Sequence, residues 1–238
     1  MLVSPHGSTW IRWLAPLGAC WAAAGCAVTG NPGLADQVAL LPQAVRNQTH
    51  VVFVESPVDV AGFGRLRETA GYLDKLGIAN VSIGYYDSCE LADRIRHVAR
   101  DHPGARVMVV GWSAGSTCIV DAARQLECEG VRIDSAVILD SEWIKGRLAE
   151  GAPSNVGRYA LVYRRGHEPP LELPNSQVYE VPTLNHFAVP TKHESVDILL
   201  TEVLRMSEPS ADPAPAVPTP AAAASQESQP GFSTRAQI

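Results

Sequence analysis

The stretch Arg106-Val107-Met108-Val109-Val110-Gly111-Trp112-Ser113-Ala114-Gly115 decides the fold of this chain. Its first half is a short apolar run, which is typical of a strand that is buried on both faces. Glycines flank Ser113 at positions 111 and 115, and an apolar stripe at helical spacing follows. A Gly-x-Ser-x-Gly pattern between a strand and a helix predicts a tight turn that presents the serine hydroxyl at the edge of a sheet.

Further short apolar runs alternate with helical patterns on both sides of this stretch. Helical periodicity is found at residues 61–76, 91–98, 114–126 and 196–204. The predicted strands cover residues 50–54, 80–85, 106–110, 134–139, 159–163 and 177–181. Strands separated by helices pair in parallel, because each parallel strand needs a crossover connection. We therefore expect an α/β fold, a three-layer sandwich in which helices flank a mostly parallel sheet of about six strands.

The candidate catalytic residues follow the predicted strands, where ligands bind in such sheets. Ser113 is the candidate nucleophile, and a serine hydroxyl needs a base to take its proton. His186 follows the last predicted strand and is the candidate base. Asp140, at the end of an earlier strand, is the candidate acid that orients His186, and Glu168 after the next strand is the alternative. The backbone N–H of Ala114 should point at the developing oxyanion.

The order Ser113, Asp140, His186 and the turn around the serine resemble the α/β-hydrolase fold family over residues 48–206. The resemblance implies a serine esterase or lipase-like enzyme that hydrolyses esters, thioesters or amides through an acyl-enzyme. It also implies that no metal and no organic cofactor takes part.

One segment departs from the family pattern. Family members usually carry His-Gly after the first core strand, and a backbone N–H just beyond it completes the oxyanion hole. This chain has Glu55-Ser56-Pro57-Val58 there, and Pro57 has no N–H to donate. Ser56 is the expected second donor, and the alternatives are Val58 or no second donor at all. This altered loop favours a second hypothesis, a catalytically weak or inactive binding or structural module of the cell envelope.

The two ends of the chain differ from its centre in composition. Residues 1–26 are predicted to be a signal or lipoprotein leader, in which Cys20 and Cys26 are candidates for lipidation. Residues 27–47 are expected to form an extended linker. Residues 207–238 are rich in Pro and Ala and are expected to be a disordered tail. The leader predicts export to the cell envelope and membrane association through a lipidated N-terminus.

Composition narrows the class of function further. The formal net charge of -6 argues against nucleic acid as a partner. The chain has five cysteines but no Cys-x-x-Cys pair, so no structural zinc site is expected. The segment between Asp140 and Tyr159 is too short for a large helical lid, and Trp143 and Ile144 could form only a small apolar wall there. We therefore expect hydrolysis of small or flexible acyl esters, with acyl transfer to an acceptor other than water as an alternative.

Overall fold

The computed structural model describes residues 27–57, 59, 61–167, 169 and 173–208. The strands are β1 (Thr49–Val54), β2 (Asn80–Gly84), β3 (Arg106–Trp112), β4 (Ser135–Leu139), β5 (Tyr159–Arg164) and β6 (Ser176–Val181). The helices are α1 (Pro32–Leu40), α2 (Gln43–Gln48), α3 (Leu66–Lys75), α4 (Ser88–Asp101), α5 (Gly115–Glu127), α6 (Ile144–Leu148), the 3₁₀ helix η1 (His186–Thr191) and α7 (His193–Ser207).

The strands form one sheet in the order β2-β1-β3-β4-β5-β6, and every neighbouring pair is parallel. β1 and β4 are buried along their whole length, because each lies between two other strands and under helices on both faces. The edge strands β2 and β6 are more exposed. The expected three-layer α/β fold with six parallel strands is confirmed for the part of the chain that the structure describes, and it is consistent with the α/β-hydrolase fold.

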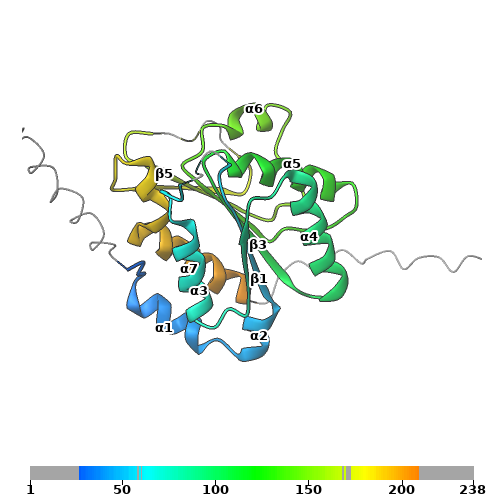
Figure 1. Cartoon of the computed structure of the whole chain (residues 1–238). Coiled ribbons are helices and arrows are strands. Elements are labelled where there is room, and N and C mark those ends of the chain that lie inside the picture. Colours follow the sequence, from blue (N-terminus) through cyan, green and yellow to red (C-terminus); the bar gives the residue numbers. More distant parts are fainter. Residues whose placement is uncertain (1–26, 58, 60, 168, 170–172, 209–238) are drawn as a thin grey trace, which may run out of the picture.

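Helices cover both faces of the sheet (Figure 1). Two apolar cores fill the spaces between the sheet and these helices. Alternate side chains of a strand enter opposite cores, because successive residues of a strand point to opposite faces. Val51 and Phe53 of β1 pack with α1, α3 and α7, whereas Val52 and Val54 pack with α4, α5 and α6. The carboxyl ends of all six described strands therefore meet at one edge of a rigid sheet.

The segment at residues 27–47 differs from the extended linker that we expected. It contains α1 and nearly all of α2, and Val38 of α1 is fully buried in the same core as α7. The reason is local: the Asn31 side chain accepts hydrogen bonds from the N–H groups of Gly33 and Leu34, and Pro32 occupies the first helical turn. The motif Asn31-Pro32-Gly33 therefore starts a helix that packs on the domain.

Some predictions concern residues outside the described part of the chain. These are the leader with Cys20 and Cys26, the alternative oxyanion donor Val58, the alternative acid Glu168 and the tail beyond residue 208. They stay predictions. Among the helices within the described ranges, none has the length and hydropathy that crossing a membrane requires.

Candidate active site

Ser113 lies on the sharp turn between β3 and α5, as its sequence pattern predicts. Its φ of 53° is in the left-handed region, which costs energy for a residue with a side chain. A Cβ on Gly111 would lie 2.8 Å from the Ser116 Cα, so only glycine lets the helix turn back this tightly. The Ser113 N–H donates to the Leu139 carbonyl (3.0 Å) and holds the turn against β4.

Ser141 provides a further hydrogen bond that stabilises this turn. Its Oγ donates to the Ser113 carbonyl oxygen (2.7 Å), and its own carbonyl accepts from the Tyr163 hydroxyl (2.8 Å). Burial raises the pKa of the Tyr163 hydroxyl, so it remains a donor. Sequence reasoning missed the role of Ser141, because nothing in the local pattern indicates that β4 and β5 support the turn after β3.

Asp140 and His186 are joined by a short hydrogen bond. Asp140 follows β4, is 3% exposed and has a φ of 48°, and its Oδ2 lies 2.6 Å from the His186 Nδ1. His186 opens η1 after β6. When Nδ1–H donates to the carboxylate, the lone pair of the imidazole is on Nε2, which is the arrangement that a general base for a serine requires. The structure therefore brings together the predicted acid and the predicted base.

The imidazole of His186 lies over the residue that precedes the serine. Its ring centroid is 4.9 Å from that of Trp112, and Phe187 packs against both rings. Trp112 is 1% exposed, so the imidazole packs against a buried indole ring. Among the described residues, no hydrogen bond joins the Ser113 Oγ to His186. Such catalytic hydrogen bonds are often long in ligand-free enzymes and shorten when substrate binds.

Arg164, at the end of β5, also contacts the acid. Its Nη1 pairs with the Asp140 Oδ2, and its backbone N–H donates to Oδ1 (3.4 Å). The Arg164 Nη1 lies 3.1 Å from the His186 Nδ1, because both nitrogens donate to the same oxygen, the Asp140 Oδ2. Burial alone would raise the pKa of Asp140, but the hydrogen bond from His186 and the charge and N–H groups of Arg164 outweigh it, so the pKa is lowered.

Arg164 is therefore not a solvated strand end. Its side chain is 18% exposed and joins a network that continues through His167, whose Nδ1 lies 2.9 Å from the Glu142 carboxylate. Parallel pairing of β4 with β5 brings the ends of the two strands together, which places Arg164 against Asp140. This adjacency depends on strand order, so it left no signal in the sequence.

The candidate oxyanion donors lie on two segments that are in close contact. A Cβ on Gly115 would be 2.7 Å from the Val54 carbonyl oxygen and 2.9 Å from that of Glu55, so the start of α5 touches the loop after β1. Ser56, in that loop, is fully buried, and its Oγ has no partner among the described residues. The N–H groups of Ala114 and Ser56 likewise have no hydrogen-bond acceptor in the described part of the chain.

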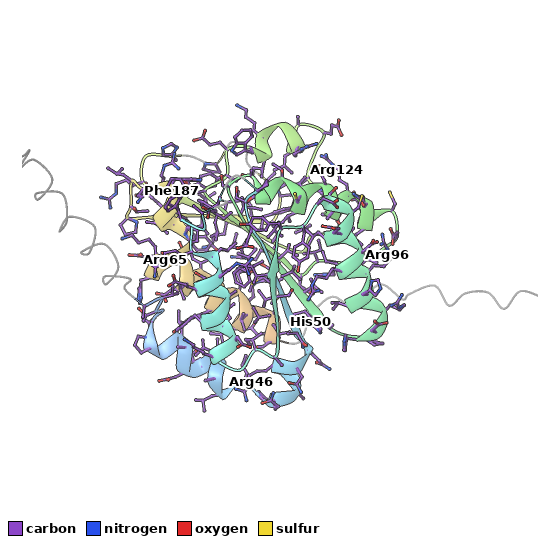
Figure 2. All side chains as sticks on the ribbon, viewed as in Figure 1. Arg46, His50, Arg65, Arg96, Arg124 and Phe187 are labelled. Carbon is purple, nitrogen blue, oxygen red and sulfur yellow. The ribbon has the colours of Figure 1, made fainter. Side chains whose placement is uncertain are left out.

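A cavity of about 330 Å³ opens beside this loop. Ser56 and Trp112 line it, together with charged and polar side chains that include Arg67 and Tyr85. Several large apolar side chains at this end of the sheet are exposed: Phe63, Trp143, Leu184 and Phe187. In Figure 2, Phe187 marks this end and His50 marks the opposite one. The site thus has a polar recess and an apolar rim.

Comparison with known proteins gives likenesses of structure alone. No family model matches the chain, and no curated protein matches its sequence. The chain is similar to the NocB thioesterase domain from the nocardicin cluster, with 16% identity over 69% of this chain and 96% of that one, at a TM-score of 0.42. It is similar to YbtT, a type II thioesterase from the yersiniabactin NRPS/PKS pathway (12% identity, 67% and 93% covered, TM-score 0.43).

A third similar structure is a cutinase of Trichoderma reesei, with 14% identity, 74% and 97% of the two chains covered and a TM-score of 0.31. The roles of the residues in this chain rest on the geometry described above.

Proposed function

We propose that this protein is a serine hydrolase that cleaves carboxylic esters or thioesters through an acyl-enzyme, with Ser113, His186 and Asp140 as its catalytic triad. The observation that supports this proposal most strongly is the 2.6 Å hydrogen bond between Asp140 and His186, with the imidazole held over the residue next to Ser113. An aspartate–imidazole pair beside a serine on a strained turn is the arrangement that activates a hydroxyl nucleophile.

In the first half of the reaction, the Ser113 Oγ attacks the carbonyl carbon of the substrate while the His186 Nε2 takes the hydroxyl proton. The carbonyl π electrons move to oxygen, and the N–H groups of Ala114 and Ser56 stabilise the resulting oxyanion. When the tetrahedral intermediate collapses, the bond to the leaving group breaks, and His186 returns the proton to the departing alcohol or thiol. Ser113 then carries the acyl group.

In the second half, water takes the place of the serine hydroxyl. His186 removes one proton from water as the oxygen attacks the acyl carbon, and the second tetrahedral intermediate expels the Ser113 oxygen, which regains the proton. Asp140 holds the imidazole in the correct tautomer and stabilises its positive charge in both halves. An alcohol in place of water would make the same site an acyltransferase.

We propose small or flexible acyl esters as substrates. α6, the helix between Asp140 and β5, spans only Ile144–Leu148, so it provides little cover over the site. A series of p-nitrophenyl esters from acetate to palmitate tests this, and kcat/KM should fall as the chain lengthens. Faster turnover of the palmitate ester would contradict the proposed substrate size.

A fluorophosphonate probe tests the proposed chemistry directly. The wild-type protein should be labelled at Ser113, Ser113→Ala should not be labelled, and Ser154→Ala, which removes an exposed serine elsewhere, should be labelled like wild type. Absence of labelling in the wild type would favour the binding or structural module instead. Product analysis with an added alcohol separates hydrolysis from acyl transfer.

Export and lipidation of the leader remain part of the proposal. Cell fractionation and mass spectrometry of the mature N-terminus, for wild type and for Cys20→Ser and Cys26→Ser, identify the acylated residue. An unprocessed and unmodified N-terminus in the cytoplasmic fraction would contradict this part.

A further inference from the structure

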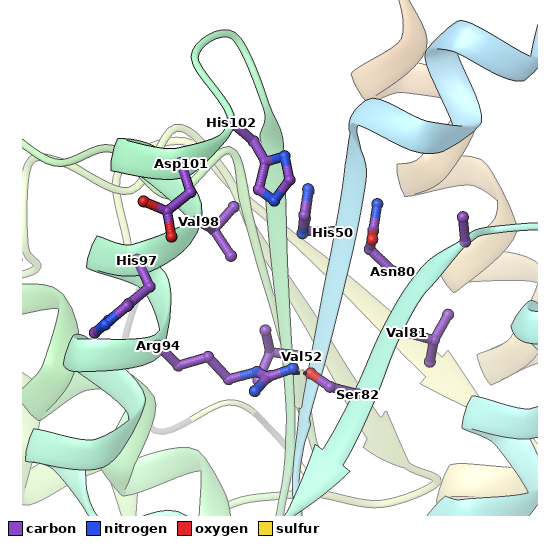
Figure 3. Close-up of a pocket in the computed structure, with 11 residues that line it drawn as sticks. His50, Val52, Asn80, Val81, Ser82, Arg94, His97, Val98, Asp101 and His102 are labelled. Carbon is purple, nitrogen blue, oxygen red and sulfur yellow. Dashed lines mark hydrogen bonds between the residues drawn. The ribbon is translucent and has the colours of Figure 1, made fainter.

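A second cavity, of about 380 Å³, lies at the opposite end of the sheet between the edge strand β2 and helix α4 (Figure 3). We call it the β2–α4 cavity. Its polar lining includes His50, Asn80, Ser82, Arg94, His97 and His102. It forms because β2 is an edge strand, and its two faces are covered differently: Val81 and Ile83 pack into the core beside α3, whereas Ser82 faces Arg94 of α4. Its volume is within the range of small-molecule sites.

His50 is the most unusual residue in this cavity. It is only 6% exposed, yet neither ring nitrogen has a hydrogen-bond partner among the described residues, and Nε2 is completely enclosed. Its ring lies 4.9 Å from that of the exposed His102, between His102 and Asn80 in Figure 3. Buried polar side chains are almost always hydrogen-bonded, and an exception calls for an explanation such as a ligand.

Arg94 supplies a positive charge that no carboxylate of the described residues neutralises. Its Nε donates to the Ser82 Oγ (3.0 Å), and its guanidinium lies 6.0 Å from the centre of the Tyr86 ring. No carboxylate of the described residues is within ion-pair distance of Arg94. The acidic residue of the lining, Asp101, is bound instead by the neighbouring Arg100 (2.7 Å).

The protonation state of His50 makes it a possible hydrogen-bond donor to an anion. Burial lowers the pKa of His50, and the charges of His102 and Arg94 lower it further, so His50 is neutral near pH 7. A neutral imidazole has one N–H to donate. A guanidinium presents a planar fork that matches the two oxygens of a carboxylate or phosphate. The cavity therefore combines a guanidinium suited to an anion with an imidazole donor that has no acceptor among the described residues.

We propose that the β2–α4 cavity binds the oxyanion group, phosphate or carboxylate, of a small ligand, with the Arg94 guanidinium as the main contact and with His102 and the Nδ1–H of His50 as hydrogen-bond donors. This site is separate from Ser113, because it lies at the amino ends of β1 and β2, and it holds whether or not the chain is a hydrolase.

Isothermal titration with inorganic phosphate and, separately, with acetate at pH 7.5 and low salt tests the proposal and distinguishes the two sources of the oxyanion. Wild type should bind at least one of the two at a single saturable site. Arg94→Gln should weaken binding at least tenfold. The matched control is Arg96→Gln on the same helix, which removes an equal charge that is paired with Glu129, and it should bind like wild type.

The NMR signals of the His50 imidazole in the wild-type protein provide a second measurement, which needs no substitution in the core. As ligand is added, their chemical shifts should change and saturate at the same ligand concentrations as the heat in the calorimetric titration. The proposal is overturned if Arg94→Gln and Arg96→Gln bind equally well, if the His50 signals stay unchanged at saturation, or if chloride at the same concentration displaces the ligand completely. Thermal unfolding of both variants confirms that they are folded.

Discussion

Gly115→Ala tests whether the contact between α5 and the loop after β1 shapes the proposed oxyanion site. The backbone at Gly115 is helical and accepts alanine without strain, so the effect of the new methyl group is purely steric. That methyl carbon would lie 2.7 Å from the Val54 carbonyl oxygen, whereas ordinary contacts begin at 3.4 Å. One of the two segments must therefore move by about 0.7 Å.

Such a shift separates the N–H groups of Ala114 and Ser56. Displacements of about 1 Å in a catalytic site cost about 10²-fold in rate, and loss of one oxyanion donor costs about 10²–10³-fold. We therefore expect kcat to fall about 10²-fold. Overpacking should also lower the free energy of unfolding by about 1–3 kcal/mol.

The assay is the hydrolysis of p-nitrophenyl acetate, with urea unfolding measured in parallel. The matched control is Gly71→Ala on the outer face of α3, where a new Cβ has no neighbour within 4 Å. It should keep the wild-type kcat and gain about 0.8–1.0 kcal/mol of stability from helix propensity. Gly115→Ala could lose stability as expected and still keep a kcat within about twofold of wild type. In that case the new methyl group does overpack the contact, but the contact between α5 and the loop after β1 does not control catalysis.

Three further substitutions test the surroundings of the nucleophile. Asp140→Asn should lower kcat about 10⁴-fold because the imidazole adopts the wrong tautomer; if Glu168→Gln alone abolishes turnover, Asp140 is not the acid. Arg164→Met removes a group that lowers the pKa of Asp140. The folded pKa lies below the unfolded value of about 3.9, so the stability from this carboxylate is complete above that value and is lost as pH falls through the folded pKa. In the variant the folded pKa lies closer to the unfolded value, so this carboxylate contributes less stability near pH 6, and the difference in urea midpoint between the two proteins should shrink as pH falls. A difference that stays constant between about pH 6 and 3 would contradict this reasoning. Ser141→Ala removes a hydrogen bond to the Ser113 carbonyl and should cost about 1 kcal/mol in urea unfolding, with Thr201→Ala on the exposed face of α7 as the control.

Much of the fold could be predicted because its signals are local. The apolar runs and the helical stripes depend on residues that are neighbours in the chain, so each predicted strand and helix of the central domain is found near its expected position. The short helices α6 and η1 were not predicted. The turn at Ser113 is equally local, because Gly111 and Gly115 act within a few residues of it. The helix start at Asn31-Pro32 is also a local signal, and it contradicts the extended linker that was expected over residues 27–47.

The pairing of Asp140 with His186 could be predicted for a different reason. In a parallel sheet all carboxyl ends share one edge, so residues that follow different strands are brought together even when far apart in the chain. The rule that ligands bind at the carboxyl ends of parallel strands identifies this edge of the sheet. Among the residues there, an aspartate and a histidine are the ones that can serve as acid and base.

The sequence by itself determined the alternation of strands and helices, the strained serine and the edge at which an acid and a base should meet, because these follow from periodicity and from short-range sterics. Only the tertiary structure decided that Arg164 and His186 both bind the Asp140 carboxylate. It also decided that the Ser141 hydroxyl stabilises the turn by donating to the Ser113 carbonyl oxygen. It alone also decided that His50, which has no hydrogen-bond partner among the described residues, lines the same cavity as Arg94. These contacts depend on which strands are neighbours and on how far a helix stands from an edge strand, and no pattern within a single segment encodes such distances.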